Sequence, residues 1–148
     1  EIMPSLVGSE MCIRDSRYIY VDSGRESVRR RIPGVLHTVN PAANDVYSIY
    51  KENTREYSLM KSEHFGTLLM MEVGALMVGK IENHPVCDHV DRGQEKGNFA
   101  FGGSTIIYMT QKGCVVPDQD LLTNSQEGVE TKVQIGSKIG SAPFLEKG

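Results

Sequence analysis

Short segments rich in β-branched and aromatic residues recur along the chain, and turn signals containing Gly, Pro, Asn or Asp separate them. This alternation is typical of strands in an antiparallel sheet. A single stretch, 118–126, has the opening residues and the closing glycine of a helix. The sequence therefore predicts one mostly β domain (a β-rich α+β fold), or part of one, with a largely antiparallel sheet and one short helix. The predicted strands are 17–22, 35–39, 47–50, 55–60, 65–73, 104–109 and 129–135.

Composition and charge exclude several classes of protein. The 148 residues carry 16 Lys and Arg against 19 Asp and Glu, so no sequence-wide positive field favours nucleic acid as a partner. Three cysteines are too few for a disulfide scaffold, which favours a reducing compartment. The longest apolar run, 65–79, contains Glu72 and is shorter than the roughly 20 residues that span a bilayer. No transmembrane segment is predicted.

The first sixteen residues differ in character from the rest. Apart from Met3 and Pro4, residues 1–16 match the translated sequence of an adapter used in transposase-based DNA sequencing libraries. They lack the basic and apolar regions of a signal peptide. We therefore expect residues 1–16 to be an adapter artefact, and the native chain to start near Arg17 as the C-terminal part of a protein truncated at its N-terminus.

Two charged or polar stretches have ordinary interpretations. Residues 82–97 are polar and predict a surface loop. The spacing of His84, Cys87 and His89 within it matches no standard zinc pattern, so no metal site is expected. The basic run 29–31 is interpreted first as a solvated edge, and a contact with anionic lipid is left open.

The stretch most suggestive of chemistry is Gly102-Gly103-Ser104-Thr105, which opens an apolar segment. Two glycines leave little side-chain shielding around the peptide bond before Ser104. The serine hydroxyl could attack the preceding carbonyl if the backbone is distorted and a base removes the hydroxyl proton. Judged on these residues alone, a tight turn is the ordinary interpretation.

Six blocks of the chain carry a family resemblance, and they are 33–41 (PGVLHTVNP), 51–56 (KENTRE), 63–66 (EHFG), 72–79 (EVGALMVG), 93–97 (GQEKG) and 101–105 (FGGST). With these blocks the chain resembles, over residues 17–142, the C-terminal half of bacterial phosphatidylserine decarboxylase proenzymes. The last block, preceded by GQEKG at this distance, is the most specific of them.

This resemblance implies a decarboxylase that makes its own pyruvoyl cofactor. The Ser104 hydroxyl would attack the Gly103 carbonyl, the resulting ester would eliminate, and hydrolysis would leave a pyruvoyl group at position 104. Residues 17–103 would then end one chain, named β, and 104–148 would form the other, named α. The pyruvoyl carbonyl would accept electrons as carbon dioxide leaves phosphatidylserine, which gives phosphatidylethanolamine. No separate cofactor or metal is implied.

Other site residues are implied in two groups, those around the scissile bond (Gly102, Gly103 and Thr105) and those that line the substrate pocket (His37, Asn40, Phe101 and Glu95). Turn sterics for the glycines, a structural role for His37 and a satisfied loop carboxylate for Glu95 remain open alternatives. The methionines Met70, Met71 and Met77 are expected to fill a core rather than to grip acyl chains.

The chain departs from the family pattern at its beginning. Family members have an Asp-Tyr-His-Arg stretch whose histidine serves the chemistry, and an aspartate farther upstream that helps activate the serine. Only Arg17-Tyr18 of that stretch is present, and Asp15 belongs to the adapter match. Ile19 stands where some members have a second histidine. We therefore expect the chain as given to stay uncleaved, or to cleave slowly, and to be inactive.

The implied partners are phosphatidylserine, an anionic membrane surface contacted peripherally, and the protein's own cleaved α and β chains. The implied location is the cytoplasmic face of the bacterial cell membrane. Two alternatives remain open. One is a non-catalytic β-rich module that binds lipid or a partner, and the other is a pyruvoyl decarboxylase of a soluble amino acid.

Overall fold

The computed structural model describes residues 16–37, 49–75, 80–86, 88–100 and 104–143. Nearly all of the segment 1–16 lies outside these ranges. Outside them also lie several residues singled out above, namely Asn40, Met77, Cys87, Phe101, Gly102 and Gly103.

The larger sheet has four antiparallel strands in the order β2-β3-β4-β7. They are β2 (Gly24–Ile32), β3 (Arg55–Ser62), β4 (Gly66–Val73) and β7 (Thr105–Thr110). The turn between β3 and β4 places Gly66 at a φ of 70°, which glycine adopts without a Cβ clash. The strands predicted at 55–60, 65–73 and 104–109 are confirmed.

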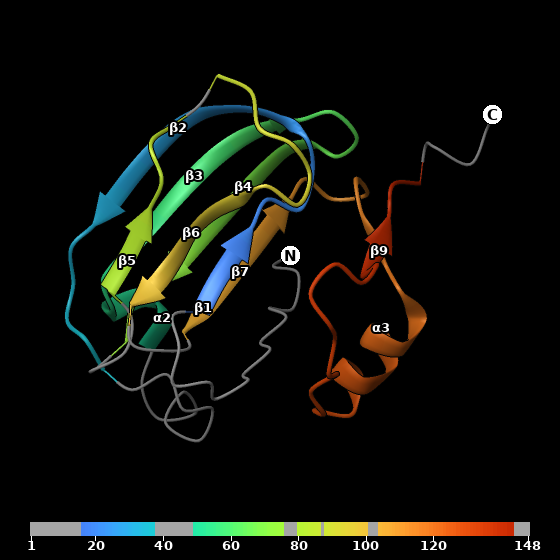
Figure 1. The fold of residues 1–148 in the computed structure, drawn as a ribbon. Helices are drawn as coiled ribbons and strands as arrows, with labels where there is room; N and C mark the ends of the chain where they lie inside the picture. The colour runs from blue at the N-terminus through green and yellow to red at the C-terminus, as the bar shows by residue number, and fades with distance from the viewer. Residues whose placement is uncertain (1–15, 38–48, 76–79, 87, 101–103, 144–148) are drawn as a thin grey trace.

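The smaller sheet has three antiparallel strands in the order β1-β6-β5. They are β1 (Ser16–Ile19), β6 (Glu95–Ala100) and β5 (Lys80–Asn83). Figure 1 shows this sheet stacked on the larger one, so the two form a two-layer sandwich. The surface loop predicted at 82–97 is wrong at both ends, because its first and last residues belong to β5 and β6.

The hydrophobic core lies between the two sheets. Along β4, Leu68 and Met70 alternate with half-buried neighbours and point inward. They belong to two clusters of buried side chains, one of Tyr18, Met70, Ile81 and Phe99 and the other of Tyr20, Met60, Leu68 and Val90. Met70 fills the core as predicted, whereas Met71 is half-buried and points to the opposite face of the sheet.

A buried ion pair joins the sheets beside this core. Glu72 of β4 and Lys96 of β6 are both fully buried, with 2.5 Å between Lys96 Nζ and Glu72 Oε1. Asn83 Nδ2 donates to Glu72 Oε2 at 3.2 Å, and Tyr18 Oη donates to Asn83 Oδ1 at 3.0 Å. Burial raises the pKa of Glu72 and lowers the pKa of Lys96, although each charge partly offsets the shift of the other.

The edge strand β2 contains the basic run. Arg30 and Arg31 are exposed there, in agreement with the interpretation as a solvated edge. Arg29 differs, because its Nε donates to Glu26 Oε1 at 2.7 Å and its side chain is largely buried. The sequence did not predict a strand over the residues of β2.

Two helices and a small two-stranded sheet complete the described residues. Helix α3 (Gln119–Gln126) confirms the helix predicted at 118–126, and it stands beside the sandwich with the strands β8 (Val116–Pro117) and β9 (Gly140–Ser141) (Figure 1). Helix α2 (Ile49–Glu52) is a single turn before β3. Within the described ranges, no helix is long and apolar enough to cross a membrane.

Two strand predictions fail over the residues that can be compared, and a third is tested only in part. The prediction at 47–50 is wrong where it can be compared, because Ile49 and Tyr50 begin α2. The prediction at 129–135 is wrong because no strand pairs with this segment, and its Val129 and Ile135 are 56% and 75% exposed. Of the segment 35–39, Val35 forms one isolated bridge with Asn53, while residues 38 and 39 lie outside the described ranges.

A buried carboxylate fastens the loops at one end of the sandwich. Asp22 is fully buried and accepts hydrogen bonds from the hydroxyl of Ser62, from Arg92 Nη2 at 2.5 Å, and from the backbone N–H of His64 at 3.1 Å. His64 Nδ1 lies 2.8 Å from Asp22 Oδ1. Burial alone would raise the pKa of Asp22, but these hydrogen bonds outweigh burial and lower the pKa to about 2.

The Asp22 cluster gives a prediction about stability and pH. Because the pKa of Asp22 lies below its ordinary value of 3.8, the charged form stabilises the fold above that value and this gain is lost as pH falls toward 2. Asp22→Asn is therefore expected to be less stable than the parent at pH 7, with a difference that shrinks between pH 4 and 2. Urea unfolding across this range measures it. Asp91→Asn, at an exposed carboxylate, is the control, and a pH-independent deficit in Asp22→Asn would contradict the prediction.

Candidate active site

Ser104 lies immediately before β7 and is half-buried. Its hydroxyl donates a hydrogen bond to the backbone oxygen of Val73, the last residue of β4. Val73 is also the strand partner of Thr105, so the hydroxyl is held where β4 and β7 meet. A carbonyl oxygen accepts this hydrogen bond but is not a base that removes the proton. Among the described residues, no histidine or carboxylate contacts the Ser104 hydroxyl.

Thr105 is the first residue of β7 and is 1% exposed. Its Oγ1 has no hydrogen-bond partner among the described residues. A buried hydroxyl left in this state costs about 1 to 3 kcal/mol, so such groups usually serve a neighbouring polar atom. Thr105 lies next to Ser104, and its implied place among the residues around the scissile bond stays a prediction.

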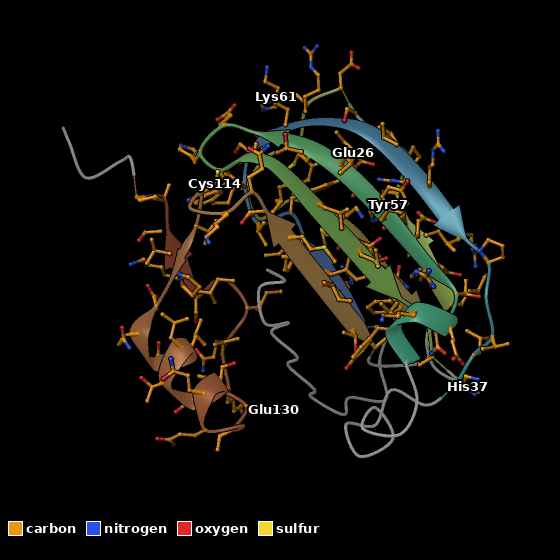
Figure 2. All side chains as sticks on the ribbon, turned by 180° about the vertical axis from the view of Figure 1, so that it is seen from behind. Glu26, His37, Tyr57, Lys61, Cys114 and Glu130 are labelled. Carbon is orange, nitrogen blue, oxygen red and sulfur yellow. The ribbon has the colours of Figure 1, made fainter. Side chains whose placement is uncertain are left out.

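The segment that contains His37 lies at the end of the sandwich where β7 begins (Figure 2). The backbone N–H of His37 donates to Asn53 Oδ1 at 3.0 Å, and Asn53 Nδ2 donates back to the His37 carbonyl at 2.9 Å. The same Nδ2 donates to the Gly74 carbonyl at 2.8 Å, one residue after Val73. The imidazole is half-exposed, with Nε2 3.7 Å from Glu52 Oε2. The structure thus links the His37 backbone to the strand end that holds Ser104.

Glu95 is placed away from Ser104. It begins β6, and the five steps from Glu95 to Ala100 span roughly 17 Å at the usual rise of a strand. Strands β6 and β7 run in opposite directions in the two sheets, so Glu95 lies toward the far end of β7 from Ser104 (Figure 1). The proposed pocket role of Glu95 stays a prediction that this placement does not favour.

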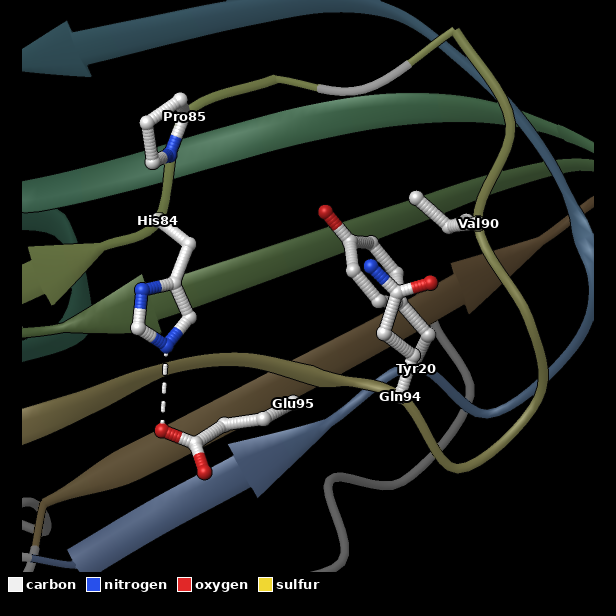
Figure 3. Close-up of a pocket in the computed structure, with 6 residues that line it drawn as sticks. All are labelled: Tyr20, His84, Pro85, Val90, Gln94 and Glu95. Atoms are coloured by element: carbon white, nitrogen blue, oxygen red, sulfur yellow. Dashed lines mark hydrogen bonds and ion pairs between the residues drawn. The ribbon is translucent and has the colours of Figure 1, made fainter.

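Glu95 lines an open pocket of about 550 Å³. Figure 3 shows its lining by Tyr20, His84, Pro85, Val90, Gln94 and Glu95. His84 Nε2 lies 3.0 Å from one carboxylate oxygen of Glu95, and Arg17 Nη1 lies 3.1 Å from the other. The hydrogen bond with His84 and the nearby Arg17 charge lower the pKa of Glu95. Both carboxylate oxygens of Glu95 therefore have a hydrogen-bond partner near this pocket.

Sequence reasoning missed Asn53 and the pair of Glu72 and Lys96. Asn53 lies inside the block 51–56, which pointed to it only as part of a matching stretch. Lys96 lies inside the block 93–97, where a charged residue was taken for a loop residue. No three His, Cys, Asp or Glu side chains in the described ranges are arranged to hold a metal ion.

Comparison with known proteins finds relatives over most of the chain. The family model for phosphatidylserine decarboxylase matches residues 6–141. Its lower bound falls within residues 1–16, whose origin as an adapter artefact stays a prediction. Phosphatidylserine decarboxylase proenzyme 2 of Clostridium acetobutylicum is 46% identical over 124 residues, which is 84% of this chain and 42% of the relative. The proenzyme of Clostridium tetani is 45% identical over 126 residues, with the same two shares. No solved structure matches.

The chain thus spans about two fifths of the length of the curated relatives it matches. The matched region includes Ser104, the Val73 carbonyl that accepts the hydrogen bond of its hydroxyl, and the buried Thr105 beside it. The family model covers well over half of the chain. On these grounds the chain belongs to the phosphatidylserine decarboxylase family.

Proposed function

We propose that the protein containing this chain converts phosphatidylserine to phosphatidylethanolamine and carbon dioxide, through a pyruvoyl group made from Ser104. The observation that carries the proposal is the position of Ser104. In a chain of this family, its hydroxyl is held on a backbone carbonyl at the start of a buried strand. A pyruvoyl group there supplies a carbonyl that binds the headgroup amine and accepts electrons as carbon dioxide leaves.

The residues of this chain have separate tasks in forming that group. The Val73 carbonyl orients the Ser104 hydroxyl, and Thr105 Oγ1 is free to hydrogen-bond the peptide group that Ser104 attacks. Attack forms an ester from the Gly103 carbonyl to Ser104 Oγ and frees the Ser104 nitrogen. Elimination then breaks the Ser104 Cβ–Oγ bond and releases the Gly103 carboxylate. Hydrolysis of the remaining dehydroalanine releases ammonia and leaves the pyruvoyl group at position 104.

None of the described residues offers Ser104 a base for this sequence of steps, so the base has to come from outside the described ranges. General-base assistance typically contributes 10²-fold to 10⁴-fold in rate. Because the chain covers about two fifths of its relatives' length, we assign that task to the part of the longer protein outside this chain. Cleavage would give one chain ending at Gly103 and another starting at position 104.

The substrate also implies a location. Because phosphatidylserine is an anionic membrane lipid, we propose that the protein works peripherally on the cytoplasmic face of the bacterial membrane. The exposed Arg30 and Arg31 on β2 are compatible with an anionic surface.

The substrate class gives a prediction. The full-length protein is expected to release carbon dioxide and form phosphatidylethanolamine from vesicles containing phosphatidylserine, and to leave free serine unchanged. Thin-layer analysis of the lipid together with carbon dioxide capture measures both. Release of carbon dioxide from free serine at a comparable rate would instead identify a decarboxylase of a soluble amino acid. Binding to the vesicles with no product would identify a lipid-binding module.

A further inference from the structure

Asn53, a residue outside the Ser104 motif, connects three separate segments at the candidate site. It lies between α2 and β3 and is fully buried. Its Oδ1 accepts from the His37 N–H at 3.0 Å, and its Nδ2 donates to the carbonyls of His37 and Gly74 at 2.9 and 2.8 Å. Both Nδ2 protons therefore have a backbone acceptor. A buried amide satisfied in this way holds its partners in fixed relative positions.

The next residue, Thr54, provides an internal comparison. Its Oγ1 accepts from the Gly34 N–H at 3.0 Å and donates to the Gly34 carbonyl at 2.8 Å. Thr54 thus ties the same incoming segment with the same kind of reciprocal bond. A Cβ at Gly34 would lie 2.1 Å from the Glu52 oxygen, so the two backbones are in direct contact there. Of these two side chains, that of Asn53 also reaches the end of β4, where it bonds the Gly74 carbonyl, whereas the side chain of Thr54 bonds Gly34.

The peptide unit between Val73 and Gly74 carries the connection to Ser104. Its carbonyl is the acceptor of the Ser104 hydroxyl, and its N–H donates to the Thr54 carbonyl at 2.7 Å. The peptide is planar, so fixing the Gly74 N–H also fixes the direction of the Val73 carbonyl. Asn53 donates to the Gly74 carbonyl, which belongs to the next peptide unit along the chain. Holding this carbonyl limits how far the Val73–Gly74 peptide can rotate.

We propose that Asn53 is a positioning residue for self-cleavage. Through the Gly74 carbonyl it restrains the neighbouring peptide unit whose Val73 oxygen holds the Ser104 hydroxyl, and it fixes the His37 segment relative to that hydroxyl. This inference rests on the proposed function, because self-cleavage at Ser104 is the reaction that the position would serve. A displacement of about 1 Å in a reacting group can cost 10²-fold in rate.

Two substitutions in the full-length protein test the proposal. Asn53→Ala removes all three hydrogen bonds and is expected to slow cleavage about 100-fold. Asn53→Asp keeps the shape and the acceptor, but the carboxylate has no proton to donate to His37 or Gly74. Its cleavage rate relative to the parent is expected to rise as pH is lowered from 8 to 5, because the protonated acid regains one donor. The rate is followed by gel and by mass during refolding or cell-free synthesis.

Two control variants separate positioning from folding. Thr54→Val removes the matched clamp on Gly34 while its backbone still bonds Gly74, so it is expected to cleave near the parent rate. Ile81→Ala opens the core at a buried residue of β5 and lowers the melting temperature without touching this clamp. It is expected to cleave faster than an Asn53 variant of equal melting temperature.

The outcomes distinguish a positioning role of Asn53 from a purely structural one. If Asn53→Asp shows no gain at low pH, or if the Asn53 variants lose cleavage only as far as Ile81→Ala does at equal melting temperature, Asn53 is structural and the proposal is overturned. If the Asn53 variants lose cleavage only because they fail to fold, Asn53 is again structural and the proposal is overturned. If the parent itself never cleaves, it is the proposed function that fails. If the parent cleaves and the Asn53 variants match its rate, only the present inference fails.

Discussion

Ser104→Ala in the full-length protein is expected to abolish both chain cleavage and decarboxylation. Alanine has no oxygen to attack the preceding carbonyl, so neither the ester nor the pyruvoyl group can form. The substitution removes one hydrogen bond to the Val73 carbonyl from a half-buried position, so we expect the variant to fold. Gel analysis of the chain and assay of carbon dioxide from phosphatidylserine vesicles measure the two effects.

Ser27→Ala is the matched control for this experiment. Ser27 also donates its hydroxyl to a backbone carbonyl across the larger sheet, that of Leu59 at 3.1 Å, but it is exposed on β2. It is expected to cleave and decarboxylate like the parent. A Ser104→Ala protein that still forms phosphatidylethanolamine would remove Ser104 from the chemistry altogether.

Lys96→Met is expected to lower the free energy of unfolding by about 3 to 5 kcal/mol, because it leaves the buried Glu72 carboxylate without its cation. Asn83 remains as a single hydrogen-bond donor and does not replace the charge. The deficit is expected to shrink as pH falls, since burial already raises the pKa of Glu72 and the protonated acid carries no charge. Urea unfolding at several pH values measures this.

The double variant Glu72→Gln with Lys96→Met separates the unpaired charge from lost packing. Removing both charges is expected to recover most of the lost stability, because replacing both members of a buried pair is far less costly than removing one. Lys80→Met is the surface control, since its ion pair with Glu82 is exposed and such pairs contribute about 0 to 1 kcal/mol. A Lys96→Met protein as stable as Lys80→Met would contradict the assigned burial of the pair.

The strands that sequence reasoning predicted correctly are those with one inward and one outward face. In β4, buried Leu68 and Met70 alternate with half-buried Leu69 and Met71. All four residues are apolar, so the sequence predicted this strand from a short apolar run, and the alternation appears only in the structure. Strand β2 was missed because its outer positions include a run of arginines, and an edge strand needs few apolar residues. The segment 129–135 has the alternation but no partner strand, which a local pattern does not reveal.

Buried charge was the second source of error. Lys96 was taken for a loop residue because it lies in the polar stretch 82–97, which predicted a surface loop. Its partner Glu72 is on another sheet and 24 positions away in the sequence, so no local spacing could connect the two. Only the packing of β4 against β6 shows that the charges meet.

Within the candidate site, the sequence singles out Ser104, whose role in the chemistry stays a prediction, and says less about its surroundings. The motif 101–105 and the family resemblance pointed to the hydroxyl, and its position at the start of β7 agrees with a role in the chemistry. The acceptor is the Val73 carbonyl, and backbone groups carry no sequence signal of their own. Asn53 acts on backbone groups as well, so its contacts became visible only in the structure.

The intact mass of the C-terminal piece of the purified full-length protein tests the central claim most directly. A chain processed at Ser104 is expected to give a piece that starts at position 104 and is lighter, by one ammonia, than a peptide starting with serine. That piece should react with a carbonyl reagent. A piece that starts with unmodified serine, or an uncleaved chain that still decarboxylates phosphatidylserine, would contradict a pyruvoyl group made from Ser104.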